Sequence, residues 1–121
     1  MILATINKSK QLLHFSLIGR VQLEEMEPGR QEVEKLLADL SPGFRLLTDL
    51  GRLDSITVDC APKIGEIMEL CDQKGVSLVV RVIPEGSKDI GLNILSLFHY
   101  AHRPRTVTCE TMVQAAEALS L

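Results

Sequence analysis

One continuous stretch, residues 44–83, constrains the fold of this chain more than any other part of the sequence. It begins with the run 44–50, a predicted buried strand, and ends with the run 76–83, which is almost continuously apolar and has Arg81 as its one charged residue. Between these runs, Pro62 suits the first turn of a helix and Gly75 suits its C-terminal cap. A continuous apolar run is typical of a parallel strand that is covered on both faces. A strand, a helix and a strand in this order predict a right-handed parallel crossover, and therefore an α/β domain.

The rest of the chain extends this pattern on both sides. Two short apolar runs before residue 19 predict a hairpin, and in the second run Leu13, Phe15 and Leu17 face one way while His14 and Ser16 face the other. We expect a single domain over residues 1–121, with a mixed, mainly parallel sheet of about five strands, the N-terminal hairpin and four helices. The expected strands are 2–6, 12–18, 44–50, 76–83 and 105–109, and the expected helices are 29–40, 62–74, 88–100 and 111 onwards, with Gly19 ending the second strand and Pro28 delaying the first helix.

The composition excludes several classes of function. The chain of 121 residues has 3% aromatic residues and a net charge of −3, so it lacks the basic, aromatic surface of a nucleic-acid-binding protein. No run approaches the roughly 20 apolar residues that span a bilayer, and the first residues lack the basic leader of a signal peptide. The spacing of Cys60, Cys71 and Cys109 contains no zinc or redox motif, which indicates buried free thiols in a reducing compartment. We therefore expect a cytoplasmic protein with no membrane span and no nucleic-acid partner.

Two short motifs carry a resemblance to a known family. The predicted strand ends in Asp-Leu-Gly from Asp49, and the predicted helix opens with Asp-Cys-Ala-Pro from Asp59. Together with Leu-Ile-Gly at 17–19 and the order of the elements, these motifs resemble the STAS family. That family contains anti-sigma-factor antagonists and the cytoplasmic tails of sulfate transporters. The resemblance covers nearly the whole chain and implies a STAS-like fold.

The same resemblance implies how regulation would differ in this chain. Members of the family switch partners through phosphorylation of a serine at the helix start, and this position holds Ala61 here. Cys60 occupies the preceding serine position of the motif. Because alanine has no hydroxyl, the resemblance implies a domain without the usual switch. Ser55 and Thr57 are the nearest substitutes for the missing acceptor.

Four residues around the predicted loop are candidates for a partner or ligand site, namely Asp49, Asp59, Cys60 and Ala61, and the first three each have a structural alternative. Asp49 lies where open α/β sheets place their sites, or it orders the loop through a hydrogen bond. Asp59 either contributes to an anion or partner site at the helix N-terminus or caps that helix. Cys60 is reactive if it is exposed at the helix start and inert if it is buried.

The predicted helix 88–100 is apolar on more than one face. A surface helix needs one apolar stripe, so we expect Leu92 and Leu95 to include a partner contact. At its end, His99 and His102 are spaced to share a helix face and bind a metal, but the favoured interpretation is that His99 and Tyr100 order the helix end through hydrogen bonds. Arg103 is a candidate for binding an anionic group, against the alternative of a solvated rim.

These observations predict a non-enzymatic regulatory or ligand-binding module that acts through protein–protein contact. The expected partner is a protein, a second copy of the chain included, or a small apolar or anionic ligand, and no cofactor or metal is expected. One rival is a small lipid or hydrophobic-ligand carrier, which requires an apolar cavity of several hundred Å³. The other rival is an enzyme that uses Cys60 or Asp59, which requires an exposed Cys60 of low pKa.

Overall fold

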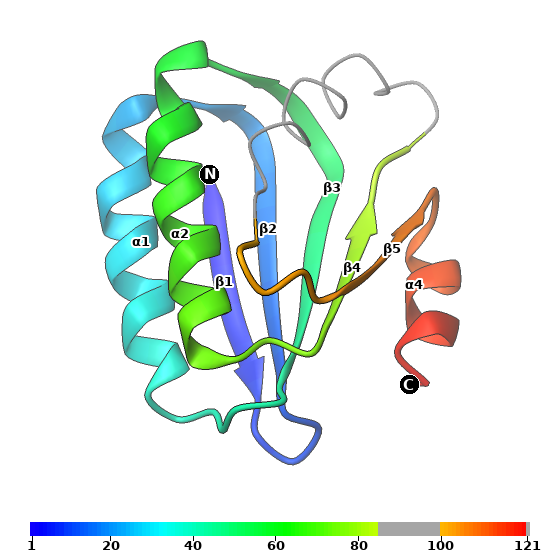
Figure 1. Cartoon of the computed structure of the whole chain (residues 1–121). Coiled ribbons are helices and arrows are strands. Elements are labelled where there is room, and N and C mark those ends of the chain that lie inside the picture. The colour runs from blue at the N-terminus through cyan, green and yellow to red at the C-terminus, as the bar shows by residue number, and fades with distance from the viewer. Residues whose placement is uncertain (85–99, 121) are drawn as a thin grey trace.

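A computed structural model describes residues 1–84 and 100–120 of the chain (Figure 1). The described part contains five strands, three α-helices and one short 3-10 helix. The strands are β1 (Ile2–Asn7), β2 (Leu12–Val21), β3 (Arg45–Ile56), β4 (Leu78–Val82) and β5 (Arg105–Cys109), and the helices are α1 (Leu23–Leu37), η1 (Val58–Cys60), α2 (Ala61–Lys74) and α4 (Met112–Ala118).

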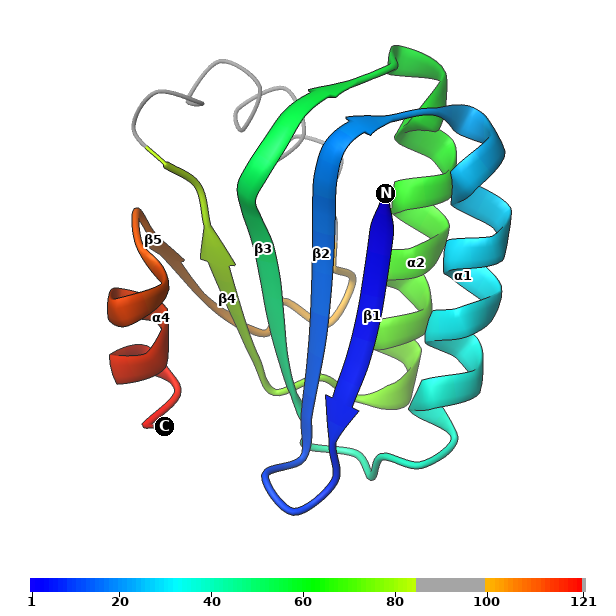
Figure 2. The ribbon, with the colours of Figure 1, turned by 180° about the vertical axis from the view of Figure 1, so that it is seen from behind.

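The strands form one mixed sheet in the order β1-β2-β3-β4-β5. β1 and β2 are antiparallel, and each later pair of neighbours is parallel. The prediction of an α/β fold with an N-terminal hairpin and three parallel strands after it is confirmed, with β4 inside the sheet. Helices α1 and α2 lie side by side on one face, and α4 lies on the other face beside β4 and β5 (Figures 1 and 2).

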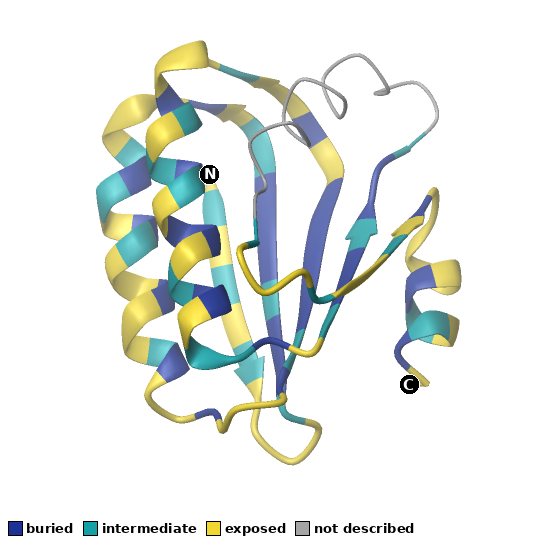
Figure 3. Ribbon diagram, viewed as in Figure 1, coloured by how far each residue is buried: buried dark blue, intermediate teal, exposed yellow. Residues whose placement is uncertain are grey.

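Each face of the sheet has its own apolar cluster. Phe15 and Leu46 are fully buried under α1 and α2, where they join Met68. On the opposite face, Leu47 packs in a smaller cluster that includes Leu119, next to the end of α4. Figure 3 shows the burial concentrated on β2, β3 and β4 and on the inner sides of the two long helices. Successive residues of β2 and β3 therefore face opposite sides of the sheet, so one residue packs under α1 and α2 and the next faces the α4 side.

The first helix begins earlier than the sequence predicts. Pro28 lies inside α1, which starts at Leu23 rather than near residue 29. Proline removes one backbone donor, but the preceding turn is held by other contacts. The Gln22 N–H donates to Glu25 Oε2 at 2.8 Å, and Met26 is completely buried in the core. The predicted delay was wrong because capping and burial together outweigh the missing hydrogen bond.

Two strands are longer than predicted. β2 passes through Gly19, which has a φ of +68°, and continues to Val21. The β2–β3 pairing shifts register at this point and again between Ser16 and Ile18. Such bulges let a glycine with positive φ remain inside a strand. β3 likewise continues to Ile56, so most of the predicted loop after residue 50 is strand.

Both predicted ends of α2 and the predicted start of α4 are confirmed. Pro62 lies in the first turn of α2, and Gly75 ends the helix in the left-handed conformation with a φ of +96°. At α4, the Gln114 N–H donates to Thr111 Oγ1 at 3.2 Å, which forms the capping box expected from the sequence.

Several predictions fall on residues 85–99, outside the described part. These are most of the predicted helix 88–100, with Leu92, Leu95 and His99, so the described residues hold three α-helices against four predicted. Within the described residues, no helix is both long and apolar enough to cross a membrane.

Candidate functional site

The end of β3 leads directly into the predicted site at the start of α2. The 3-10 turn carries Val58, which is 90% exposed, and Cys60, which is completely buried. The Thr57 hydroxyl and the Cys60 thiol are 3.2 Å apart. Ala61 begins α2 and is partly buried. Since Cys60 is shielded from solvent, it cannot act as the exposed nucleophile that the enzyme hypothesis needs.

Asp59 does not cap the helix, contrary to the structural alternative for this residue. Its side chain is exposed, and neither the 3-10 turn nor α2 has a side-chain N-cap hydrogen bond. The chain instead enters α2 through the turn itself, because Cys60 N donates to Thr57 O at 3.0 Å. Pro62 supplies a preset helical φ at the next step. Asp59 is therefore a free carboxylate on the outer surface of the turn.

Asp49 is not part of this surface. It pairs with Val82, the last residue of β4, but β3 continues to Ile56, about 23 Å further at about 3.3 Å per residue. Asp49 is 7% exposed, and its Oδ1 accepts a hydrogen bond from Gly51 N at 2.8 Å. The structure thus separates Asp49 from Asp59 and confirms for Asp49 the predicted local hydrogen bond, here inside a strand.

Asp49 instead belongs to a polar cluster with His14 and Ser16. Ser16 and Asp49 are register partners on β2 and β3, and Ser16 is 2% exposed. His14 Nε2 lies 3.1 Å from Ser16 Oγ and 4.0 Å from Asp49 Oδ2. Sequence reasoning placed His14 and Ser16 on the polar side of their strand but did not link them to Asp49. That link depends on the strand register that pairs Ser16 with Asp49, which lies 33 positions further along the chain.

This cluster resembles a nucleophilic triad only in composition. In a working triad, the serine contacts one imidazole nitrogen and the carboxylate contacts the other. Here Ser16 Oγ and Asp49 Oδ2 both lie on the Nε2 side of His14. The carboxylate therefore cannot orient the ring for proton abstraction from Ser16, so the arrangement is unsuited to nucleophilic catalysis.

The segment before β5 is tied to α2 by one buried carboxylate. Asp72 accepts hydrogen bonds from Ala101 N at 3.1 Å, from His102 N at 3.3 Å and from His102 Nδ1 at 2.9 Å. The His102 ring is thus turned towards the carboxylate that holds this segment against α2. Arg103 has an exposed side chain and a φ of +47°, consistent with a tight turn at a solvated rim.

Buried polar groups continue beneath this segment. The Tyr100 hydroxyl donates to Met68 Sδ at 2.9 Å, and burial raises the pKa of Tyr100. Burial also lowers the pKa of Arg81 and raises the pKa of the Cys71 thiol to about 12. Cys71 therefore stays protonated and, like Cys60, has a structural role.

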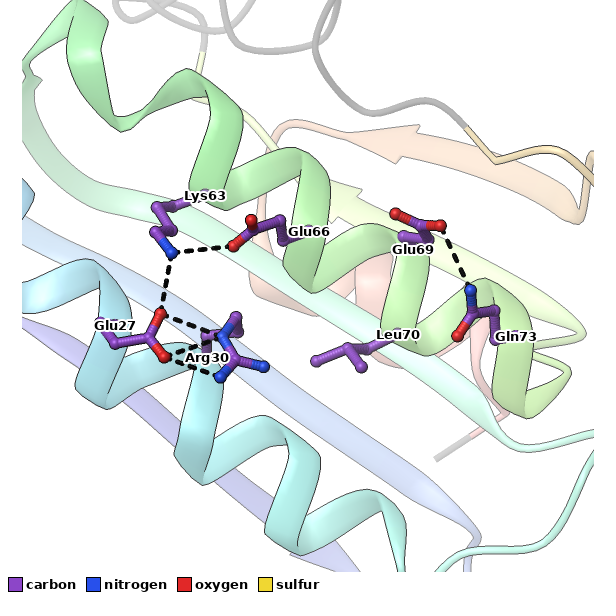
Figure 4. A pocket seen from close by; sticks show the side chains of 7 residues that line it. All are labelled: Glu27, Arg30, Lys63, Glu66, Glu69, Leu70 and Gln73. Carbon is purple, nitrogen blue, oxygen red and sulfur yellow. Dashed lines mark hydrogen bonds and ion pairs between the residues drawn. The ribbon is translucent and has the colours of Figure 1, made fainter.

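A charged groove runs between α1 and α2 (Figure 4). It has a volume of about 380 Å³ and is bridged by Glu27, which lies 2.7 Å from Arg30 and 3.0 Å from Lys63. Hydrogen bonds from Arg30 and Lys63 lower the pKa of Glu27 to about 2. A second groove of about 330 Å³ shares Leu70 and Gln73 with the first. The first groove is lined mainly by charged and polar side chains, which is unlike the apolar cavity of a lipid carrier, and the second has equal numbers of apolar and polar side chains.

The fold was then compared with known proteins. No family model matches the chain, and a search of curated proteins finds no match in sequence. An uncharacterized protein from the DUF3478 family of Shewanella loihica PV-4, with a SpoIIAA-like fold, is 18% identical with a TM-score of 0.70, over 98% of this chain and 92% of that one.

Two structures of SpoIIAA also match over almost the full length. The anti-sigma factor antagonist SpoIIAA in its unphosphorylated form is 12% identical with a TM-score of 0.60, over 99% of this chain and 98% of that one. The phosphorylated form of the Bacillus cell fate determinant SpoIIAA is 12% identical with a TM-score of 0.58, over 98% and 99%. The chain therefore has a SpoIIAA-like, STAS-like fold, as predicted. Because one fold supports many functions, the function of this chain depends on its own residues.

Proposed function

We propose that this domain is a non-enzymatic module that binds a protein partner through the surface where β3 leads into α2. This partner surface consists of Val58, Asp59 and the exposed first turn of α1 at Leu23. The observation that carries the proposal is Val58, an aliphatic side chain 90% exposed on a short turn. Leu23 is 42% exposed at the start of α1, which contacts the same turn. Apolar side chains presented on a rigid turn favour contact with another protein.

The chemistry of the same surface favours binding without covalent switching. The buried Cys60 and the methyl group of Ala61 leave the start of α2 without a hydroxyl or an accessible thiol. Ser55 and Thr57 are exposed on the preceding strand and turn. Thr57 has a structural task because its side chain contacts Cys60. We infer that partner binding here is constitutive rather than controlled by phosphorylation at the α2 start.

Photo-crosslinking from a single position tests this proposal. A photoreactive amino acid replaces Val58 in one version of the protein and Val113 in another, each expressed in cells of the source organism. Val113 is 70% exposed and lies on α4, on the other side of the sheet, so it is a matched control for an exposed valine. We expect a discrete protein adduct from position 58 and none from position 113.

Introducing a charged side chain at position 58 or 113 tests the proposed surface by its effect on partner affinity. Val58→Glu would place a carboxylate in an apolar contact, where desolvation without a partner costs about 1–3 kcal/mol or more. We expect binding of the identified partner to weaken by at least tenfold, while Val113→Glu leaves it unchanged. Equal adducts from both positions, or unchanged binding of the Val58 variant, would contradict the proposed surface.

The other partner hypotheses have less support among the described residues. A hydrophobic-ligand carrier would need an apolar cavity, whereas the groove bridged by Glu27 is charged and the second groove is lined by as many polar as apolar side chains. Self-association through Leu92 and Leu95 remains a prediction from the sequence, because both lie outside the described part. Replacing by Glu whichever of the two leucines faces outward should abolish self-association or partner binding while leaving the fold intact.

A further inference from the structure

Strand β1 forms one edge of the sheet (Figure 2). It comes first in the sheet order, and no other strand lies beyond it in the described part of the chain. Met1 N donates to Ile18 O at 2.7 Å, and Ile18 N donates to Met1 O at 2.8 Å. In an antiparallel pair, positions that exchange two hydrogen bonds alternate with positions that exchange none. Every second residue of β1 after Met1 therefore bonds to β2, and the residues between them do not.

The residues between them are Ile2, Ala4 and Ile6. Their backbone N–H and C=O groups point away from β2 at the edge of the sheet, and no described residue outside β1 bonds to them. Their side chains pack against the core and are only partly buried. Leu3, on the opposite face of the strand, is 45% exposed. The edge thus presents unbonded backbone groups together with incompletely covered apolar side chains.

This edge has none of the common features that prevent a strand from pairing with another chain. Natural edge strands are often protected by a charged residue, a proline or a bulge. The sequence of β1, Ile-Leu-Ala-Thr-Ile-Asn, contains no charged residue and no proline, and its pairing with β2 shows no register shift. The strand is therefore a regular template for one more strand.

The strand is complementary to a second copy of itself. In an antiparallel pair centred on Ala4, the Ala4 residues of the two copies lie opposite each other, and Ile2 of each copy lies opposite Ile6 of the other. All these positions have outward-facing backbone groups, so each opposing pair can exchange two hydrogen bonds. On the exposed face, Leu3 of each copy would lie opposite Thr5 of the other. This two-fold arrangement gives every outward-facing position of β1 a partner.

Helix α1 leaves room for this arrangement. The helix contacts both β1 and β2, so it lies above this pair of strands. Neighbouring strands are about 4.8 Å apart, so a helix midway above β1 and β2 is about 10 Å from its symmetry mate across the joined edge. Packed helices are separated by about 8–10 Å. The α1 helices of the two copies would therefore lie side by side and add to the contact between the strands.

The charges at the two ends of β1 favour an antiparallel second copy. At the start of the strand, Glu25 of α1 lies 2.9 Å from the Met1 amino nitrogen, and Glu24 is exposed next to it in the chain. After the end of the strand, Lys8 and Lys10 are exposed in the turn to β2, and neither forms an ion pair with a described residue. Antiparallel pairing brings the basic end of each copy towards the acidic end of the other. Such charge complementarity fixes the register of an interface and suppresses wrong arrangements.

We propose that β1 binds a second copy of this chain by antiparallel pairing, which joins the two five-stranded sheets into one continuous sheet. The interface consists of β1 and the flank of α1 above it. Because this contact is small, the dimer is weak and depends on protein concentration. The interface is a different surface from the one at Val58 and from the predicted contact at Leu92 and Leu95, and the inference depends on neither.

Sedimentation velocity of the purified protein tests the association. We expect the wild type to shift from monomer to dimer as its concentration rises to about 1 mM. Ala4→Pro removes an outward-facing N–H and leaves every hydrogen bond between β1 and β2, because proline is tolerated on an edge strand where the N–H faces solvent. We expect this variant to dimerise at least tenfold more weakly than wild type, with an unchanged circular dichroism spectrum.

A second variant keeps the test independent of proline. Leu3→Lys combined with Thr5→Lys places like charges opposite each other across the joined strands, where they are destabilising. Both side chains are exposed, so the fold should be retained while dimerisation weakens at least tenfold. Val113→Lys is the matched control, because it introduces the same charge at an exposed apolar residue of α4, and it should leave dimerisation within twofold of wild type.

Hydrogen exchange at increasing protein concentration locates the interface. We expect the amides of Ile2, Ala4 and Ile6 to exchange more slowly as the dimer forms, whereas those of Leu3 and Thr5, already bonded to β2, change less. A wild type that stays monomeric over the whole concentration range would overturn the proposal. So would a folded Ala4→Pro variant that dimerises like wild type, or a dimer in which the three outward-facing amides exchange at unchanged rates.

Discussion

Asp72 is the residue whose replacement most directly tests the architecture described above. Its carboxylate is 5% exposed and connects α2 to the segment that precedes β5. Asp72→Ala removes the acceptor for two backbone N–H groups, at Ala101 and His102. A hydrogen bond to a charged group contributes about 1.5–3 kcal/mol, and an unsatisfied buried donor costs about 1–3 kcal/mol.

Two effects reduce the sum of these terms. Ala101 and His102 are exposed, so water can partly replace the lost acceptor. Removing the carboxylate also removes the cost of keeping a charge away from solvent. We therefore expect Asp72→Ala to lower the free energy of unfolding by about 2–3 kcal/mol. For a chain of this size, each kcal/mol corresponds to roughly 3–5 °C in the melting temperature.

His102→Ala separates the ion pair from the backbone hydrogen bonds. The His102 side chain is 77% exposed, so its pairing with Asp72 contributes about 0–1 kcal/mol. Urea unfolding of wild type, Asp72→Ala and His102→Ala measures both contributions. A loss for Asp72→Ala no larger than that for His102→Ala would show that the backbone hydrogen bonds are not the source of stability. A loss below about half a kcal/mol would place Asp72 among ordinary surface residues.

Three further outcomes follow from other described residues. Treatment with a kinase that phosphorylates STAS domains should leave the peptide 51–63 unmodified, and mass spectrometry that finds phosphate on Ser55 or Thr57 would refute constitutive binding. Arg45→Ala removes hydrogen bonds to the Leu119 carbonyl and to the Lys10 carbonyl, so hydrogen exchange in α4 should become faster while exchange in α2 stays the same. Glu27 should titrate by NMR near pH 2, and its contribution to stability should be present above pH 4.5 and lost as the pH falls through about 2, because its folded-state pKa is lowered; an ordinary midpoint would contradict the ion pairs.

The sequence predicts those features that depend on neighbouring residues. Three such features are the apolar run at β4, Pro62 at the start of α2 and Gly75 at its end. Each of them depends only on residues close to it in the sequence. Alternation along β2 also places His14 on the polar side of its strand. These local signals are enough to predict the order of the elements and the parallel sheet, because each crossover has a preferred hand.

The errors arise where distant contacts outweigh a local signal. Pro28 indicates a helix boundary by itself, but the burial of Met26 extends α1 past it. Gly19 indicates a strand end, but pairing with β3 carries β2 further. Asp59 has the residue type of a helix cap, yet the turn that contains it leaves the carboxylate exposed. The cluster around Asp49 needs the register of β2 against β3, which no local pattern contains.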